Sequence, residues 1–185
     1  MKGSGNNFST LFKKLWFFCL PTSGMRSRYL KRNSKMFRAF GEKVFYQPRT
    51  LPSDPEYISI GSNVKIASGV VFINHDVIHY MFNDAHYSDS IFLPKVGCIM
   101  IGNNVMIGAK VLIMPNVKIG NNVIIAAGSI VTKDIPSNTI WGGVPARFIG
   151  RIEELIEKRK YVSAVGNEEV WEDFKKQRSN DSFSK

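Results

Sequence analysis

Large apolar residues recur at every sixth position along the middle of the chain. They fill nine places of one frame: Ile60, Ile66, Phe72, Ile101, Ile107, Ile113, Ile119, Ile125 and Val131. This period does not follow one face of an α-helix, because six steps of about 100° leave successive side chains about 240° apart. In an extended chain all nine side chains point to the same side, and the Gly-Asn and Asn-Asn pairs between them favour tight turns. The pattern predicts an all-β solenoid, a three-sided parallel β-helix with three hexads per coil, and disfavours a β-sandwich.

The hexad frame is interrupted once. One coil of three hexads after Ile60 would place the next copy of its motif at Ile78, but that copy begins at Ile101. The frame fails at Asn74-His75-Asp76, where an acid falls on an inward position, and an insertion follows over residues 78–100. A solenoid loops out at a corner, and such loops are common places for functional sites on a rigid scaffold.

Helical patterns flank the predicted β-helix, which we place at residues 42–150. Residues 1–41 form a basic arm, in which apolar side chains recur at helical spacing opposite two lysines: Phe8, Leu11, Phe12, Leu15 and Trp16, with Lys13 and Lys14 opposite. This arm either caps the open end of the solenoid or lies on an anionic membrane as an amphipathic segment. We favour capping. Residues 151–185 form a C-terminal helical tail, with a break expected near residues 163–167.

The charge of the chain is concentrated in this arm. Residues 1–50 hold eleven basic residues and one acid, which accounts for the whole net charge of +10 over 185 residues. No nucleic-acid-binding motif accompanies the charge, so we expect no nucleic-acid partner. The longest apolar run near the start, residues 15–20, is far shorter than the roughly 20 residues of a membrane span. Two cysteines, Cys19 and Cys98, favour a reducing compartment, so we expect a cytoplasmic protein, with membrane association as a second possibility.

The closing repeats carry a family resemblance. The run Ile125–Pro136 leads into Trp141-Gly142-Gly143-Val144-Pro145-Ala146-Arg147. This segment resembles the hexapeptide-repeat acyltransferases, in particular the maltose, galactoside, nodulation and capsule O-acetyltransferases. The resemblance implies a left-handed β-helix and a homotrimer with active sites between subunits. It also implies an acetyl-CoA-dependent O-acetyltransferase that acts on a hydroxyl of a sugar or surface-polysaccharide precursor.

The same resemblance implies the site residues. His75, at the root of the loop, matches the catalytic base of these enzymes, and an imidazole can take the hydroxyl proton at neutral pH. Asp76 is adjacent, but neighbouring residues on a strand point to opposite faces, so it need not orient the ring. A backbone N–H at Gly108–Ala109 is expected to stabilise the oxyanion, and Ala127, one coil later, leaves room for the pantetheine arm. The remaining cofactor contacts implied are Thr132, Lys133, Arg147 and Arg151.

Three other functions stay open at this point. The acceptor could be an antibiotic or serine, because both occur on this architecture. A non-enzymatic β-helix scaffold is a further alternative. Carbonic anhydrases of the γ type share the β-helix and bind metal through three histidines, but their ligands come from separate coils. Here His75, His79 and His86 lie together in one short stretch, so we expect no metal site.

Overall fold

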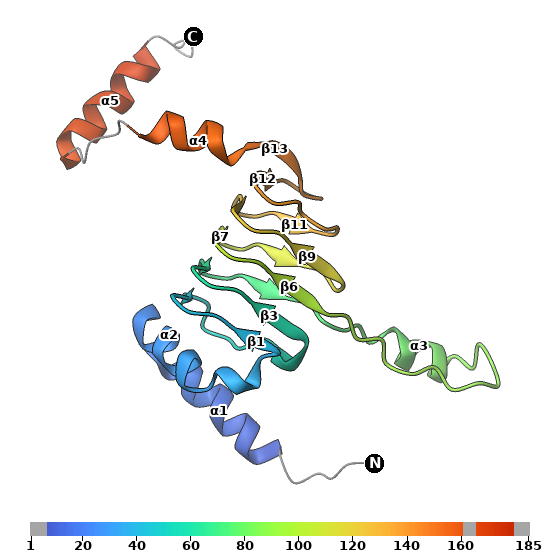
Figure 1. The fold of residues 1–185 in the computed structure, drawn as a ribbon. Helices are drawn as coiled ribbons and strands as arrows, with labels where there is room; N and C mark the ends of the chain where they lie inside the picture. The colour runs from blue at the N-terminus through green and yellow to red at the C-terminus, as the bar shows by residue number, and fades with distance from the viewer. Residues whose placement is uncertain (1–6, 161–165, 180–185) are drawn as a thin grey trace. The chain divides into compact units, whose positions relative to one another are not determined.

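Three stacks of short parallel strands form the body of the protein (Figure 1). The computed structural model describes residues 7–160 and 166–179. Sheet A contains β1 (Ala39–Phe40), β3 (Ile58–Ile60), β6 (Ile99–Ile101) and β9 (Val117–Ile119). Sheet B contains β2 (Phe45–Tyr46), β4 (Lys65–Ile66), β7 (Val105–Ile107), β10 (Val123–Ile125) and β12 (Thr139–Gly142), and ends in the antiparallel strand β13 (Arg147–Arg151). Sheet C contains β5 (Val71–Phe72), β8 (Leu112–Ile113) and β11 (Ile130–Val131).

The chain visits sheets A, B and C in turn, with three hexads in each regular coil. Ile99 pairs with Val117, Val105 with Val123, and Leu112 with Ile130, so each strand stacks on the one three hexads later. Across the insertion Ile58 pairs with Ile99, so the inserted segment leaves the stacking of the coils intact. The predicted parallel sheets and their register are confirmed. The first strand, β1, begins slightly before the boundary we placed at residue 42.

The hexad side chains form the core. All nine residues of the frame are at most 6% exposed, because strand residues six apart share the inward face. Burying one such aliphatic side chain contributes about 1.5–3 kcal/mol. The stacked columns of Ile and Val therefore hold successive coils together.

An asparagine ladder stabilises the corner between sheets A and B. Asn63, Asn104, Asn122 and Asn138 all adopt positive φ, from 54° to 63°. The side-chain amide of each of the first three donates to the side-chain carbonyl oxygen of the next asparagine in the column, at 3.0, 2.9 and 2.8 Å. Asparagine suits this corner because it tolerates the left-handed conformation and pairs with its own copy.

The inserted loop leaves the corner between sheets C and A and carries α3 (Ile78–Asp84). It projects away from the stacked coils (Figure 1). The inward position at its root is filled by Asn74, which is 2% exposed and donates to the Gly97 carbonyl at 3.1 Å. The expectation that Asp76 points inward is wrong. Its carboxylate instead accepts from the Ile78 N–H at 3.1 Å, because regular strand structure ends before Asp76 and the chain turns into α3 there.

Two helices, α1 (Asn7–Cys19) and α2 (Ser23–Arg32), precede the first coil, followed by the 3₁₀ turn η1 (Ser34–Met36). Phe17 is fully buried, with its ring 5.5 Å from that of Tyr29 and 5.8 Å from that of Tyr46. Leu20, Leu30 and Phe37 join the same hydrophobic core. These residues cap the core of the solenoid. The contribution of α1 comes from the face that carries Phe17, and not from the face that we predicted.

The predicted capping face of α1 is exposed. Phe12, Leu15 and Trp16 are 61%, 60% and 56% exposed, while the side chains of Phe8 and Leu11 lie outside the described residues. At about 100° per residue, Phe17 points roughly opposite to these three. The helix therefore has two apolar faces, of which the body of the protein covers one.

Residues 1–153 and 154–185 form two compact units. Two helices, α4 (Ile152–Arg159) and α5 (Asn167–Ser179), follow the last strand, and residues 163–165 of the predicted break lie outside the described residues. The apolar side chains of α5 are exposed, at 44–59% for Val170, Trp171 and Phe174. Among the helices described, none is long and apolar enough to cross a membrane.

Candidate active site

His75 is paired with an aspartate that sequence reasoning missed. The imidazole Nδ1 lies 2.5 Å from Asp54 Oδ2, and both side chains are partly accessible, at 40% and 28%. His75 follows β5 directly after the buried Asn74, so the alternation of the strand turns its ring outward. The adjacent Asp76 is engaged with the N–H of Ile78 instead.

Asp54 reaches His75 because the first coil is slightly longer than three hexads. Ala39 pairs with Ser59 and Tyr46 with Ile66, and the same register brings the segment around Asp54 beneath His75. Asp54 precedes the 3₁₀ turn η2 (Pro55–Tyr57), whose proline helps to fix the backbone. The near-copy of Ile60-Gly61 at Phe40-Gly41 was the signal that could have revealed this pair, because it defines the length of the first coil.

The pairing determines which imidazole nitrogen is available. An ionised carboxylate can only accept hydrogen bonds, so Asp54 holds the proton on Nδ1 of His75. The other nitrogen, Nε2, is then unprotonated and able to accept a proton from a substrate. The arrangement matches that of a general base whose ring is oriented by a carboxylate.

The other two histidines do not share this arrangement. The ring of His79 lies against Tyr80, with centroids 4.1 Å apart, and His86 Nδ1 contacts the Asp84 carbonyl at 2.9 Å. Over residues 7–160 and 166–179, no group of three or more His, Cys, Asp or Glu side chains is arranged to hold a metal ion.

Small residues line the corner between sheets B and C. A Cβ atom at Gly108 would lie only 2.5 Å from the backbone nitrogen of Ala127, so only glycine allows the two coils to stack there. The Gly108 N–H is already engaged between the coils, because it donates to the Ile125 carbonyl at 2.8 Å. The N–H of Ala109 donates to no backbone carbonyl within the described chain. Ala109, and not Gly108, therefore has the donor that a ligand oxyanion could use.

The predicted cofactor residues fall at two different corners. Arg147 pairs with Gly142 at the end of β12, which places it at the B–C corner with Gly108, Ala109 and Ala127. Thr132 and Lys133 follow β11 and lie at the C–A corner, two coils from His75. Arg151 pairs with Thr139 at the opposite end of β13 from Arg147. The predicted cofactor residues that are exposed are Ala127, Thr132, Lys133, Arg147 and Arg151, whereas Gly108 is buried and Ala109 is partly buried.

One face of the coil separates these two corners. The extended residues Val111–Met114 alone span about 10 Å at roughly 3.3 Å per residue. His75 and the corner that carries Ala109 and Ala127 therefore lie at opposite ends of a strand face in one chain.

Comparison with known proteins identifies close relatives of this arrangement. The family "Bacterial transferase hexapeptide (six repeats)" matches residues 99–133. Protein CapG of Staphylococcus aureus is 40% identical over 124 residues, which cover 65% of this chain and 70% of CapG. Galactoside O-acetyltransferase of Escherichia coli K12 is 44% identical over 114 residues, 60% of this chain. The chain spans only about half of that enzyme's length, 52%.

A solved structure extends the similarity to the whole body. A galactoside acetyltransferase in complex with coenzyme A superimposes with a TM-score of 0.61 at 28% identity, covering 89% of this chain and 90% of that one. The matched share is large enough to include the coils that carry His75 and the two corners described above. The fold is therefore shared with a protein whose structure was solved in complex with coenzyme A.

Proposed function

Because this chain belongs to the hexapeptide-repeat acyltransferase family, we propose that it is an acetyl-CoA-dependent O-acetyltransferase acting on a hydroxyl of a sugar or surface-polysaccharide precursor. The observation that carries this proposal is the His75–Asp54 pair, which leaves Nε2 of the imidazole free as a base. The sugar acceptor is supported by the galactoside O-acetyltransferase relatives. Family membership also leads us to infer a left-handed winding of the coils.

The residues have defined roles in this reaction. Nε2 of His75 removes the proton of the acceptor hydroxyl while its oxygen attacks the carbonyl carbon of the acetyl thioester. The Ala109 N–H donates to the oxyanion that forms on that carbonyl. The C–S bond then breaks, and the imidazolium returns its proton to the departing thiolate. Asp54 stabilises the imidazolium between the two steps.

The cofactor contacts follow the family pattern. Ala109 and Ala127 leave a shallow groove that a pantetheine arm fits. Lys133, Thr132 and Arg147 supply the cations and the hydroxyl group that bind phosphates. Arg151 stays a weaker candidate because it lies at the far end of β13 from Arg147.

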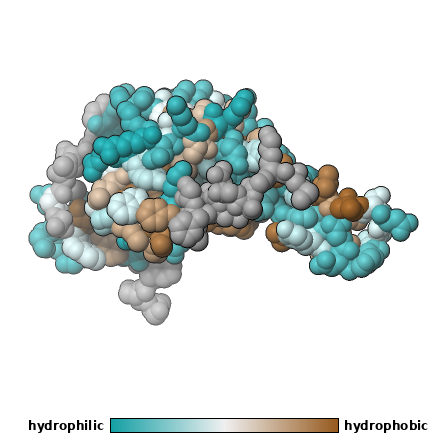
Figure 2. Space-filling view, turned by 90° about the horizontal axis from the view of Figure 1, so that it is seen from below, coloured by the Kyte–Doolittle hydropathy of each residue, from teal (hydrophilic) through white to brown (hydrophobic). Residues whose placement is uncertain are grey.

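We propose a homotrimer in which His75 of one chain faces Ala109 and Ala127 of the next. The separation of the two corners supports this assembly, because His75 and the groove at Ala109 and Ala127 lie at different corners of one chain. The projecting loop supports it as well, since it exposes a set of large apolar side chains: Tyr80, Tyr87, Ile91 and Leu93, at 62–81%. Figure 2 shows such hydrophobic groups on the projecting part of the surface. Exposed apolar surface of this extent is typical of an interface.

We further propose that the outer face of α1 contacts an anionic membrane surface. Phe12, Leu15 and Trp16 lie within about 100° of arc on this face and are exposed. Lys13 and Lys14 lie toward the opposite side of the helix, on either side of Phe17, and are exposed too. An amphipathic helix with aromatic and basic residues in this arrangement fits the boundary of a bilayer. Capping through Phe17 and membrane contact through Trp16 use different faces, so the two are compatible.

An acceptor panel tests the proposed reaction. The purified chain is mixed with acetyl-CoA and each candidate acceptor, and release of free CoA thiol is measured against a no-acceptor control. Sugars and oligosaccharides should stimulate release, while serine and aminoglycoside or macrolide antibiotics should not. Stimulation by a non-sugar acceptor alone would contradict the sugar assignment. Failure of acetyl-CoA to bind would contradict the enzymatic function itself.

A further inference from the structure

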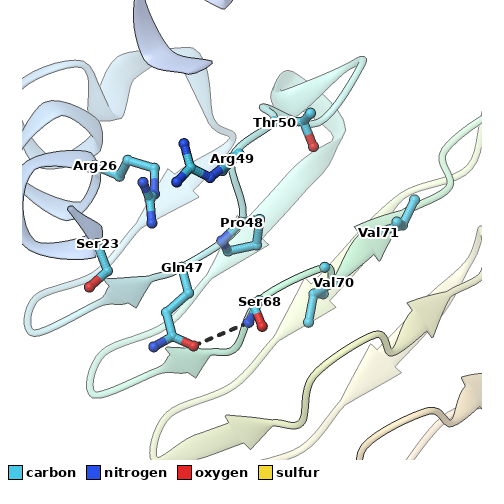
Figure 3. A pocket seen from close by; sticks show the side chains of 10 residues that line it. Ser23, Arg26, Gln47, Pro48, Arg49, Thr50, Ser68, Val70 and Val71 are labelled. Atoms are coloured by element: carbon cyan, nitrogen blue, oxygen red, sulfur yellow. Dashed lines mark hydrogen bonds between the residues drawn. The ribbon is translucent and has the colours of Figure 1, made fainter. Parts of the chain in front are cut away.

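A cavity of about 510 Å³ lies between α2, the segment Gln47–Thr50 and the start of β5 (Figure 3). It exists because the first coil contributes no strand to sheet C, where β5 is the outermost strand. After β2 the chain instead runs irregularly through residues 47–54. The segment and the edge of β5 therefore leave a hollow between them.

Two arginines line this cavity. Arg26, on the first turns of α2, is only 6% exposed, and its Nη1 donates to the Leu20 carbonyl at 2.7 Å. Its Nε is buried without a hydrogen-bond partner. Arg49 comes from the opposite wall, and the two guanidinium groups point toward one another (Figure 3).

No negative charge balances this pair. The described residues that line the cavity include no aspartate or glutamate. The phenol of Tyr46 does not serve as an anion, because burial raises its pKa well above the ordinary value. Burial and the nearby charge of Arg49 both lower the pKa of Arg26. A buried cation with an unsatisfied N–H costs free energy that a bound anion would recover.

Neutral donors surround the same hollow. The carbonyl oxygen of Gln47 is fixed by the Ser68 N–H at 3.1 Å, which leaves the NH₂ group of Gln47 to donate elsewhere. The hydroxyl groups of Ser23 and Thr50 are on the lining, and Ser23 is the first residue of α2. Two guanidinium groups with hydroxyl and amide donors are the chemistry that binds phosphate or carboxylate.

We propose that Arg26 and Arg49 bind a phosphate or carboxylate group of the acceptor, so that the acceptor is an anionic carbohydrate. This inference rests on the proposed O-acetyltransferase function. A second cavity of about 250 Å³ connects the site with the chain that leads to the reaction centre, because it shares Thr50, Val70 and Val71 and is also lined by Leu51–Ser53, the residues that precede Asp54. Along the extended strand, Val71 and His75 are about 13 Å apart.

This distance defines the kind of acceptor. It is longer than one sugar ring, so the anion belongs to a neighbouring sugar or to the phosphate of an activated sugar, not to the ring that is acetylated. The anion also lies apart from the candidate partners of the CoA phosphates. Lys133 follows β11, two coils beyond β5, and Arg147 begins β13, beyond β12.

Ligand binding to the acetyl-CoA-free protein tests the site without depending on catalysis. Titration calorimetry with pyrophosphate and with glucuronate, each at constant ionic strength, should detect binding to the wild type. Arg49→Gln should weaken that binding about 10-fold, the effect of losing one charge-assisted pair. Arg38→Gln removes the same charge from an exposed side chain that does not line the cavity, and should leave binding within about 2-fold of wild type.

Thermal unfolding separates a binding role from a structural one. In the absence of anions, Arg49→Gln should unfold at the same temperature as wild type or higher, because it removes the repulsion on Arg26. Pyrophosphate should raise the wild-type Tm and leave that of Arg49→Gln almost unchanged. A lower Tm for anion-free Arg49→Gln would indicate a structural role and overturn the proposal.

The remaining outcomes are equally decisive. Binding of pyrophosphate alone assigns the anion as a phosphate, and binding of glucuronate alone assigns it as a carboxylate; either supports the site. Binding of neither overturns it, as does an equal loss in Arg49→Gln and Arg38→Gln. If coenzyme A displaces pyrophosphate from the wild type, the anion belongs to the cofactor and the acceptor assignment is wrong.

Discussion

Asp54→Ala is the variant that most sharply tests the chemistry of the site. In the structure the Asp54 carboxylate contacts the proposed base through one bond, between its Oδ2 atom and Nδ1 of His75 at 2.5 Å. A hydrogen bond to a charged group contributes about 1.5–3 kcal/mol. Each 1.4 kcal/mol corresponds to about a factor of 10 in rate, so full loss of this bond would slow turnover by roughly 10- to 150-fold.

Exposure reduces that figure. The side chains of His75 and Asp54 are 40% and 28% accessible, so water can partly replace the carboxylate. We therefore expect kcat of Asp54→Ala to fall about 10- to 50-fold, toward the lower part of that range. The KM for acetyl-CoA should stay unchanged, because Asp54 lies several coils before Thr132 and Lys133 and at a different corner from Ala109. Steady-state release of CoA thiol at varied acetyl-CoA measures both quantities.

A double-mutant cycle shows whether Asp54 acts through the imidazole. His75→Ala alone should lose about 10²- to 10⁴-fold in turnover, as expected for a general base. In that background Asp54→Ala should cause less than about a 2-fold further loss, since the two residues act as a unit. Asp76→Asn is the matched control, because its side chain still accepts from the Ile78 N–H and does not contact His75. Additive losses, or a larger loss in Asp76→Asn than in Asp54→Ala, would refute the orienting role.

Three further predictions concern the asparagine ladder, the inserted loop and the N-terminal arm. Asn104→Ala breaks two hydrogen bonds of the asparagine ladder and places alanine at φ 57°, so it should lower the free energy of unfolding in urea by about 2–3 kcal/mol. Asn104→Gly breaks the same bonds but tolerates this φ, so it should lower that free energy by only about 1 kcal/mol, and equal losses would contradict the conformational argument. Leu93→Asp combined with Ile91→Asp should shift the sedimentation of the chain from trimer to monomer without unfolding it, and an unchanged trimer would exclude the loop from the interface. Leu15→Ser combined with Trp16→Ser should abolish co-sedimentation with phosphatidylglycerol vesicles at low salt and leave the Tm unchanged; if wild type fails to co-sediment, the membrane contact is wrong.

The β-helix could be predicted from sequence because its signals are local. Each inward residue such as Ile107 is defined by its own hexad, and each corner asparagine such as Asn104 by the turn it occupies. Repetition makes these signals reinforce one another along the chain. The start of the first coil was harder to place, because Phe40-Gly41 copies Ile60-Gly61 at a spacing longer than three hexads.

The active-site pair and the capping face could not be predicted in the same way. Asp54 lies in an irregular segment without a repeat, so only the stacking of the first two coils brings it to His75. In α1, apolar residues occur on nearly every side, and sequence alone does not decide whether Phe17 or Trp16 faces the core. Tertiary packing decides both, and it also brings Arg26 and Arg49 together across the cavity, although they lie far apart in sequence.

Subunit complementation tests most directly the central claim that His75 of one chain works with the B–C corner of another. His75→Ala lacks the base, and Ala127→Trp fills the groove with a side chain at an exposed position. Each variant alone should be nearly inactive. In a cyclic trimer that contains both variants, one of the three interfaces joins an intact His75 to an intact Ala127. Co-refolding equal amounts should therefore restore about a quarter of wild-type CoA release, since three quarters of the trimers are mixed. If each site lies within a single chain, the mixture will stay as inactive as its components, and the shared-site account will be wrong.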